Sequence, residues 1–558
     1  MYRYLLKGKV RVALFLMLLC VSSVTGALFA LVMSALVDCV QKDGKEQLLT
    51  LLGSVVYVIA YIALGISYNV VKASFLANAR YRLKNDIFTG IMKRSIADFD
   101  AENSAEYINE MSNNMNMFEG IYFENIITTF ELVISFAAGV AVCLSVQPLM
   151  LVLMIVLALI TMVVTRFTTS PLEKSSQKFA EKFGEYTAEL ADDFGAFRLS
   201  HSFGILALIL QKHDRKNKEA EDAKKSNTNC QTFCAYVGSF VGLLSTVLVM
   251  AMAAYFSAKG MFSVGMVIAF GQLIGVIVSP ITMIPAVVAN FRAAKPLQER
   301  FLQLRKQPDE DGTEILSGLK SAVSFEKVSF GYQNDKEVIH QLSLRLEVGK
   351  HYAIVGSSGS GKSTLLSLFL GHYPGYDGKI CFDGVELRKL KRDALSEIIG
   401  VVSQDTFMFN DTIYNNIALY QEGYTQQDVI QAIRQAGLGE LLDSLPDGVS
   451  TIINENGKNF SGGEKQRFSL ARAILRKKKI LLLDEFTANM DEPTAKEIEE
   501  RMLSWEDAMI VTVTHRLNPQ ILRHYDKILV LSQGNIVESG KYDELLAVDG
   551  YFKKMAIG

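Results

Sequence analysis

The stretch GSSGSGKST, Gly356–Thr364, decides the fold of the second half of this chain. It fits the pattern G-x-x-x-x-G-K-[ST] at every position. A strand-like run, HYAIV at 351–355, precedes it, and a helix-like run, STLLSLFL at 363–370, follows it. Glycines let consecutive backbone N–H groups turn inward, and the start of a helix adds partial positive charge. The stretch therefore predicts a phosphate-binding loop between a strand and a helix.

Each position of this loop is a candidate nucleotide contact. The Lys362 ammonium is placed to reach the β- and γ-phosphates, and the Ser363 hydroxyl is a suitable ligand for Mg²⁺. A chance Gly/Ser loop is the alternative, and the flanking strand and helix disfavour it. The predicted ATP-binding residues of the loop are Gly356, Ser357, Ser358, Gly359, Ser360, Gly361, Lys362, Ser363 and Thr364.

Two further motifs lie about a hundred residues downstream, FSGGEKQR at 460–467 and ILLLDE at 480–485. Asp484, at the end of an apolar strand, is a candidate Mg²⁺ ligand. The adjacent Glu485 is a candidate for orienting or deprotonating an attacking water. A purely structural role for two carboxylates at a buried strand end is the alternative. A phosphate loop in the same sheet makes that role the weaker hypothesis.

The first 300 residues contain long stretches without any charge, and a membrane helix needs about 20 apolar residues. Four stretches each accommodate one span. The one at 132–165 is too long for one span and is broken by Gln147-Pro148, a turn signal. Running the third helix upstream through Glu131 gives six spans. The uncharged stretches are 12–37, 47–71, 132–165, 226–258 and 260–291.

Lysine and arginine are abundant in every second segment between the spans, beginning with the N-terminal one, and scarce in the others. This distribution predicts that the N- and C-termini both lie in the cytoplasm. A cleaved signal peptide is the alternative for the first stretch, but its apolar region far exceeds the usual ~7–15 residues. The expected location is the cell membrane, as a multi-pass protein of a bacterial plasma membrane. The net charge of −2 implies no attraction to nucleic acid.

Taken together, these motifs resemble one family, the ABC transporters, and within it the six-helix half-transporters of the exporter type. The resemblance covers the whole chain. Besides the phosphate loop and the ILLLDE strand, it rests on Tyr332 in VSFGYQ, Gln404 in VVSQD, and His515 in VTVTHRL. The signature at 460–464 and the loop at 487–491 occur in the family's order. The implied fold is an α-helical transmembrane domain followed by an α/β P-loop ABC ATPase domain.

The resemblance implies a role for each matching residue. Tyr332 would stack on adenine, Gln404 would sense the γ-phosphate or Mg²⁺, and His515 would contact the γ-phosphate. The signature would complete the ATP site of an opposite protomer. Its residues are Ser461, Gly462, Gly463 and Glu464.

The departures from the family pattern are modest and remove no group that the chemistry needs. One is the loop after the catalytic Glu, which reads Ala488-Asn489-Met490-Asp491. Glu464 stands where the family usually has Gln, and Phe460 stands where it usually has Leu. Phe486 replaces the usual Pro after the catalytic Glu.

The implied organisation is a transmembrane domain at 1–297, a linker at 298–320 and an ABC nucleotide-binding domain at 321–558. Such a half-transporter works with a second half-transporter, in a homodimer or a heterodimer, within the lipid bilayer. Short coupling helices are expected near 98–106 and 197–206, where the cytoplasmic connections would dock on ATPase domains.

The predicted function is ATP-driven transport, with ATP and Mg²⁺ as cofactors and an amphipathic small molecule, lipid or peptide as exported cargo. Import of siderophore-like cargo on the same scaffold is an alternative, and so is an ATP-gated receptor or channel. ABC ATPases of DNA repair or translation share the motifs but lack membrane spans. For Glu131 two roles are open, a contact with cationic cargo and a helix-end or interhelical contact.

Overall fold

The computed structural model describes residues 1–306, 312–316, 318–332, 337–404, 406–454 and 456–557. The chain forms two compact units. The helical unit comprises Met1–Met92 and Ser104–Lys306, and the ATPase unit comprises Lys93–Asn103 together with 307–558. Residues 307–311 and 317 of the predicted linker lie outside the described residues. The preceding part of that segment, up to Arg305, continues a helix.

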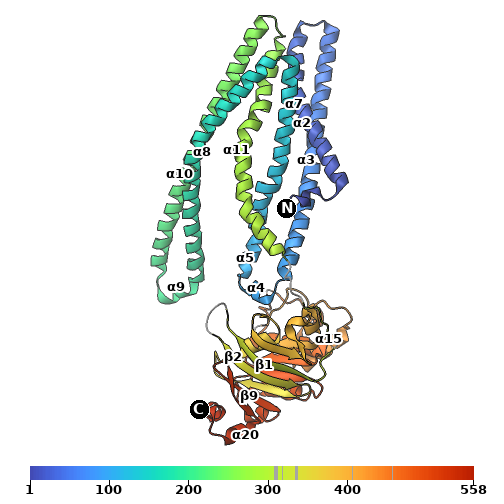
Figure 1. The fold of residues 1–558 in the computed structure, drawn as a ribbon, viewed down its shortest axis with the longest axis vertical. Coiled ribbons are helices and arrows are strands. Elements are labelled where there is room, and N and C mark those ends of the chain that lie inside the picture. Colours follow the sequence, from blue (N-terminus) through green and yellow to red (C-terminus); the bar gives the residue numbers. More distant parts are fainter. Residues whose placement is uncertain (307–311, 317, 333–336, 405, 455, 558) are drawn as a thin grey trace. The chain divides into compact units, whose positions relative to one another are not determined.

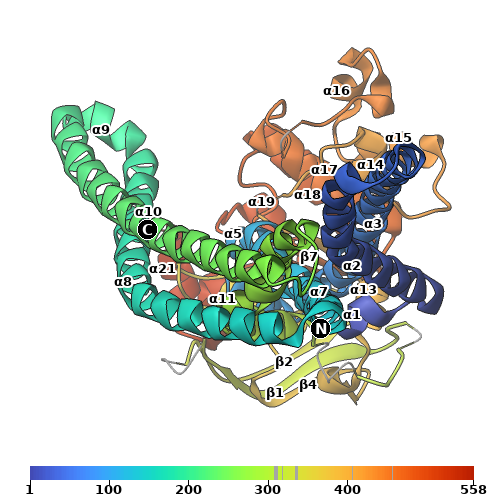
Figure 2. The ribbon, with the colours of Figure 1, turned by 90° about the horizontal axis from the view of Figure 1, so that it is seen from above.

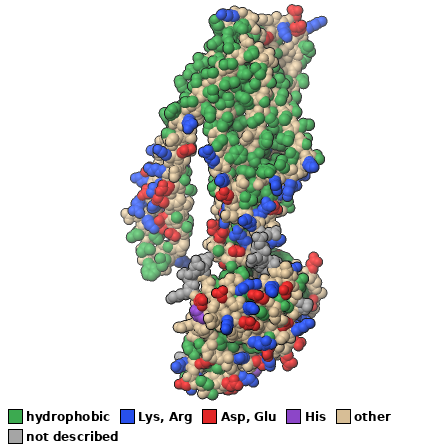
Figure 3. Space-filling view, viewed as in Figure 1, with side chains coloured by type: hydrophobic (Ala, Val, Ile, Leu, Met, Phe, Trp, Pro, Cys, Tyr) green, Lys and Arg blue, Asp and Glu red, His purple; other side chains and the backbone are tan. Residues whose placement is uncertain are grey.

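Six helices of the helical unit are long and apolar enough to cross a membrane, which confirms the predicted number of spans. The break predicted at Gln147-Pro148 is also confirmed, since one helix ends at Val146 and the next begins at Pro148. Figure 3 shows hydrophobic side chains gathered over one end of this unit. The spanning segments are α2 (Lys9–Asp38), α3 (Gly44–Met92), α7 (Asn125–Val146) with the turns that precede it from Ser104, α8 (Pro148–Gly195), α10 (Leu206–Ala258) and α11 (Gly265–Arg305).

Helices α8 and α10 pack along each other and are joined by the short helix α9, Phe197–Phe203 (Figures 1 and 2). α8 has 48 residues, so at 1.5 Å per residue it is about 70 Å long, more than twice the ~30 Å of a bilayer core. Apolar side chains at the tip of this hairpin are exposed, among them Phe194 at 73% and Phe203 at 74%. We call this surface the hairpin tip; its other members are Phe197, Leu199 and Leu208.

The remaining helices pack closely enough to require glycine at particular crossings. A Cβ on Gly90 of α3 would lie 2.3 Å from the carbonyl oxygen of Leu304 in α11. Because this neighbour is backbone, the crossing leaves no space for a side chain. A compact apolar cluster fills the space between α7, α8, α10 and α11, with Met154 and Phe270 fully buried in it.

Three carboxylates along the segment from Ser104 to Val146 each pair with a base on a neighbouring helix. Glu110 pairs with Arg300 of α11 at 3.1 Å, and Glu119 pairs with Arg80 of α3 at 2.5 Å. Glu131 pairs with the Lys72 ammonium of α3 at 3.0 Å and also accepts a hydrogen bond from the Tyr68 hydroxyl. Of the two roles open for Glu131, the structure therefore shows the interhelical contact.

We expect Glu131→Gln to destabilise the helical unit, because it leaves the Lys72 charge within the spans without its partner. The loss is about 1–3 kcal/mol of unfolding free energy, the usual cost of leaving a buried hydrogen-bonding group unsatisfied. The double variant Glu131→Gln/Lys72→Gln should recover part of that loss, because no charge is then left unpaired. Thermal unfolding of the purified variants measures both. Equal losses in the single and double variants would contradict this pairing, and an altered cargo profile at unchanged stability would favour a cargo contact.

The ATPase unit contains two sheets, which the sequence did not separate. A four-stranded antiparallel sheet has the order β2-β1-β4-β5, and a six-stranded sheet has the order β10-β9-β3-β8-β7-β6. In the second sheet all pairs but β9–β10 are parallel, as predicted from the alternation of strands and helices. The strands are β1 (Ala322–Phe330), β2 (Ile339–Glu347), β3 (His351–Val355), β4 (Asp377–Phe382), β5 (Val385–Glu386), β6 (Ile399–Val402), β7 (Ile480–Asp484), β8 (Met509–Val513), β9 (Lys527–Ser532) and β10 (Asn535–Gly540).

The helices of this unit cover the parallel sheet and form a separate group beside its β6–β7 edge. One apolar core lies between the two sheets around Phe325, Phe369 and Phe382, and a second lies under α15 and α17. The main helices are α12 (Lys362–Phe369), α13 (Arg392–Ile398), α14 (Ile413–Ala418), α15 (Gln426–Gln435), α17 (Gly462–Arg476), α18 (Glu492–Leu503), α20 (Tyr542–Ala547) and α21 (Tyr551–Ile557), with α4 (Ile96–Asp100) from the first connection.

Since β3, β7 and β8 are parallel neighbours, their carboxyl ends meet at one edge of the sheet. The phosphate loop follows β3. Asp484 ends β7 and Glu485 comes next, and His515 comes two residues after β8. The sheet thus brings residues separated by more than 100 positions in sequence to a single edge.

Candidate nucleotide-binding and hydrolysis site

The phosphate loop joins buried strand β3 to helix α12 as predicted. Gly359 and Gly361 have φ of +76° and +103°, conformations that an L side chain rarely adopts. A Cβ on Gly356 would lie 2.2 Å from the Leu531 carbonyl oxygen of β9, so the loop passes directly against the neighbouring strand. The hydroxyl of Ser360 is buried and has no hydrogen-bond partner among the residues that the structure describes. A cradle of backbone N–H groups with an unused buried donor suits the oxygens of a phosphate.

The Lys362 side chain folds back over this loop. Its ammonium donates to the carbonyl oxygens of Gly356 at 3.0 Å and Ser357 at 2.8 Å. Burial lowers the pKa of Lys362, and the charges of Glu485 and Asp484 act in the opposite direction. A partly buried ammonium beside the backbone N–H groups of this loop forms strong charge-assisted hydrogen bonds with a phosphate.

Glu485, His515 and Gln404 lie together at the carboxyl edge of the sheet. One carboxylate oxygen of Glu485 is 2.9 Å from His515 Nε2, and the other accepts from the Gln404 amide at 3.3 Å. Glu485 has φ of +46°, unusual for a residue other than glycine. Its backbone is held there because its N–H donates to the Val513 carbonyl at 3.0 Å. The structure therefore brings together the three residues predicted for catalysis.

Asp484 ends β7 beside them. Burial raises its pKa, and the neighbouring Glu485 charge adds to the rise. Such a carboxylate gains most from a nearby cation, which lowers the pKa again. The donor set predicted for Mg²⁺, the Ser363 hydroxyl, the Gln404 amide and the Asp484 carboxylate, consists of oxygen ligands of the kind that Mg²⁺ takes alongside phosphate oxygens. These residue types fit the ion.

Tyr332 follows β1 and is 42% exposed. Its hydroxyl lies 3.1 Å from the Thr364 hydroxyl of the phosphate loop, and Tyr373 packs edge-on at a centroid distance of 5.2 Å. The predicted adenine-stacking residue is therefore adjacent to the phosphate loop and held in position by a second aromatic ring.

The signature residues 461–464 make no hydrogen bond with the phosphate loop among the residues described. Ser461 caps α17, and the Glu464 carboxylate accepts from the Ser461 N–H at 2.7 Å and its hydroxyl at 2.8 Å, completing a capping box. Glutamate at this position, a departure from the family pattern, thus stabilises the helix start. Ser461 and Gly462 are exposed at the start of α17.

The sequence did not point to Tyr551, which begins the C-terminal helix α21. The side chains of Ser532 and Ser357 lie near its phenol and lower the pKa of that group. The Glu538 carboxylate of β10 holds this helix by accepting from the backbone N–H groups of Tyr551 and Phe552. No spacing rule could have found this contact, because it depends on how α21 folds back across the end of β9.

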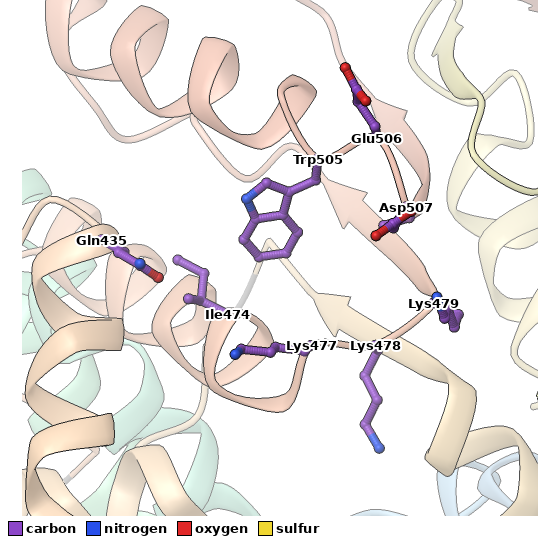
Figure 4. Close-up of a pocket in the computed structure, with 9 residues that line it drawn as sticks. Gln435, Ile474, Lys477, Lys478, Lys479, Trp505, Glu506 and Asp507 are labelled. Carbon is purple, nitrogen blue, oxygen red and sulfur yellow. The ribbon is translucent and has the colours of Figure 1, made fainter.

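The ATPase unit also has a surface hollow of about 360 Å³ that is separate from the candidate site. Figure 4 shows the Trp505 ring and the Lys477 side chain facing into it. It lies where β7 and β8 begin, after Lys479 and Ala508, at the edge opposite to Glu485. It therefore takes no part in the candidate site.

Two family models match the chain. The model described as "ABC transporter transmembrane region" matches residues 12–281, and the model described as "ABC transporter" matches residues 339–488. Together they cover about three quarters of the chain and assign its two units in the order predicted.

Individual proteins show the same similarity. The chain is 32% identical to the uncharacterized ABC transporter ATP-binding protein YwjA of Bacillus subtilis over 66% of this chain and 65% of that protein. It is 31% identical to the ATP-dependent lipid A-core flippase of Vibrio cholerae, over 63% and 61% of the two chains. The alignments with these two relatives thus span somewhat less than two thirds of their length.

Two longer matches complete the comparison. The fatty acid ABC transporter ATP-binding/permease protein of Mycobacterium bovis is 28% identical over 85% of this chain and 75% of that protein. The solved structure of a bacterial Atm1-family ABC exporter with ATP bound superposes with a TM-score of 0.83, at 25% identity, over 98% of this chain and 97% of that one.

Proposed function

Because this chain belongs to the ABC transporter family, we propose that it is one half of an ATP-driven exporter that moves an amphipathic small molecule or lipid across a membrane. One observation carries the proposal: a single chain contains six apolar spans and a phosphate loop. At the edge of the sheet where this loop lies, Glu485, His515 and Gln404 come together. Hydrolysis chemistry and a membrane domain in one chain favour transport over a soluble ATPase.

At the hydrolysis site we assign each role from the contacts above. The backbone N–H groups of 356–364 and the Lys362 ammonium bind the phosphates, and Tyr332 stacks on the adenine. Glu485 orients a water and accepts its proton, while His515, 2.9 Å from that carboxylate, holds it in place and faces the γ-phosphate. Ser363, Gln404 and Asp484 hold Mg²⁺, whose chemistry is to neutralise charge on the phosphate oxygens.

The second half of each site comes from another half-transporter. Ser461 and Gly462 are exposed at the start of α17, and this surface would complete the partner's site. The hairpin tip offers a second surface. The phenylalanines of the hairpin tip are exposed, and Figure 3 shows hydrophobic side chains at the end of this charged hairpin, which suits docking on another protein. Homodimer and heterodimer both satisfy this arrangement.

The Lys and Arg distribution supports an orientation with both termini and the ATPase unit in the cytoplasm. The same rule assigns the connection between α8 and α10, which carries clustered charges such as the Lys216–Glu185 pair at 2.8 Å, to the cytoplasmic side. A bacterial plasma membrane is the setting that matches the relatives from Bacillus subtilis and Vibrio cholerae.

An apolar hollow between α7 and α11 favours weakly charged or lipid-like cargo. It measures about 480 Å³ and is lined by apolar side chains such as Phe136 and Ile284. Glu131, on the same helix as Phe136, is neutralised by Lys72 at 3.0 Å, so it supplies no free charge for a cation. Relatives named for lipid A-core and fatty acids are consistent with such cargo.

Transport in sealed vesicles tests this function. Purified protein is reconstituted into proteoliposomes with fluorescent lipid or amphipathic dye probes, and ATP is added outside. We expect probe movement from the outer face, where the ATPase unit lies, toward the vesicle interior, with Lys362→Ala vesicles as the inactive control. Movement in the opposite direction would indicate import. ATP-dependent leakage of both probe and ions would indicate a gated channel.

A further inference from the structure

Residues 487–491 begin two positions after the catalytic Glu485 and are held from three sides by groups to which the function above gives no role. The Thr487 hydroxyl donates to the Glu499 carboxylate of α18 at 2.7 Å, and both residues are buried. A buried carboxylate bonded to a buried hydroxyl fixes the start of the loop. Burial raises the pKa of Glu499, as expected for a carboxyl shielded from water.

The middle of the loop is held by Gln466 of α17, which is only 1% exposed. Its side-chain oxygen accepts from the Asn489 N–H at 3.3 Å, and its side-chain nitrogen donates to the Gln404 carbonyl at 3.4 Å. One buried amide therefore connects the loop with the backbone of Gln404, whose side chain contacts Glu485. A Cβ on Gly463 would lie 2.6 Å from the Asn489 carbonyl, so α17 packs directly on the loop.

The end of the loop is held by Arg516, the residue after His515. Its guanidinium donates to the Met490 carbonyl at 2.9 Å and lies 3.5 Å from the Ala488 carbonyl. Its own N–H donates to the Thr514 hydroxyl at 3.0 Å, which fixes the start of the side chain. A planar guanidinium presents several donors in a fixed geometry, so it holds two neighbouring carbonyl oxygens more rigidly than a lysine ammonium on a flexible stem does.

Resting on the function proposed above, we propose that Arg516 is a positioning residue for hydrolysis: it ties the 487–491 loop to the His515 segment so that Glu485 keeps its active backbone conformation. The reason lies in the φ of +46° at Glu485. A left-handed conformation at a residue other than glycine persists only where its surroundings enforce it. The carbonyl of Glu485 accepts from the Ala488 N–H at 2.9 Å, so the position of the loop acts directly on the catalytic residue.

Substituting Arg516 should leave the fold intact. Its side chain is part-exposed and lines a surface hollow of about 850 Å³, so removing it opens space to solvent and creates no sealed void. Arg501 offers a matched control in the same unit. It also donates to a backbone carbonyl of another segment, Gln435 at 2.6 Å, and it makes no contact with the 487–491 loop among the residues described.

The first measurement is hydrogen exchange on the full-length protein without nucleotide. Three consecutive amides of the loop are hydrogen-bonded, at Ala488, Asn489 and Met490. In Arg516→Ala we expect them to exchange about tenfold faster, because local opening becomes easier when the bonds to Ala488 and Met490 are lost. Arg501→Ala should leave them unchanged, and Arg516→Lys should give a smaller increase. Unchanged exchange in Arg516→Ala would overturn the proposal.

The second measurement is steady-state ATP hydrolysis. Arg516→Ala should lower kcat about tenfold and leave KM for ATP within about twofold, since misplacing a catalytic group slows the chemical step without weakening phosphate binding. Faster exchange with unchanged kcat would refute the positioning role. If the wild-type protein hydrolyses no ATP, the proposed function fails, while the exchange result still decides whether Arg516 holds the loop.

Discussion

Glu485→Gln is expected to abolish most ATP hydrolysis while leaving ATP binding intact. The substitution keeps the shape of the side chain but removes the carboxylate that faces His515 Nε2 at 2.9 Å and Gln404 at 3.3 Å. Loss of a general base usually lowers turnover by about 10²- to 10⁴-fold. The phosphate loop, Lys362 and Asp484 are unchanged, so the nucleotide remains bound and the two ATPase units should be trapped in the closed, ATP-bound dimer.

Steady-state turnover and filter-bound nucleotide on the purified variant measure the two effects separately. Glu497→Gln is a matched control, because it removes one negative charge from an exposed site on α18 that pairs only with Arg501 at 2.7 Å among the ion pairs described. Wild-type turnover in Glu485→Gln would remove the residue from the catalytic role. Loss of both binding and turnover would indicate instead that the substitution disrupts the fold of the ATPase unit.

Mixing two inactive variants is expected to restore activity. Lys362→Ala removes the ammonium that lies over the phosphate loop, which should weaken ATP binding by about 10- to 100-fold, the usual effect of losing a charge-assisted bond. Ser461→Arg places a bulky cation at the exposed start of α17 and should block the partner's site. A mixed dimer of the two variants retains one site with an intact phosphate loop and an intact signature.

Random assembly gives half mixed dimers, each with one of two sites intact, so recovered activity should reach about a quarter of the wild-type value if the sites act independently. Each variant alone stays inactive and is the control. No recovery after co-expression would mean that the signature does not act across a homodimer. Activity that persists in isolated monomers would contradict the composite-site proposal altogether.

Several parts of this structure followed from local sequence. The phosphate loop was predictable because the glycines at 359 and 361 must adopt positive φ and because a lysine and a hydroxyl must follow at fixed spacing. The six spans were predictable because the bilayer imposes a length of apolar sequence that few other structures require. The turn at Gln147-Pro148 followed from the proline, whose missing N–H and fixed φ favour a helix start.

The division of the strands between two sheets was not predictable in this way. β1 and β2 read as ordinary strands, and only pairing over long sequence separations places them with β4 in an antiparallel sheet. The partner of Glu131 was equally hidden, because Lys72 lies 59 residues away on another helix. Periodicity shows which face of a helix is apolar but does not show which polar group of a neighbouring helix will lie opposite.

The sequence alone thus determined the chemistry of this protein: a phosphate loop, an acidic strand end and six membrane spans, each specified by local backbone requirements or by the thickness of a bilayer. The tertiary structure alone decided how these parts meet. The parallel order of β3, β8 and β7 places Glu485 against His515, and packing of α17 and Arg516 around 487–491 holds Glu485 in a left-handed conformation. Such contacts depend on long-range packing, because each joins residues whose local sequences carry no information about one another.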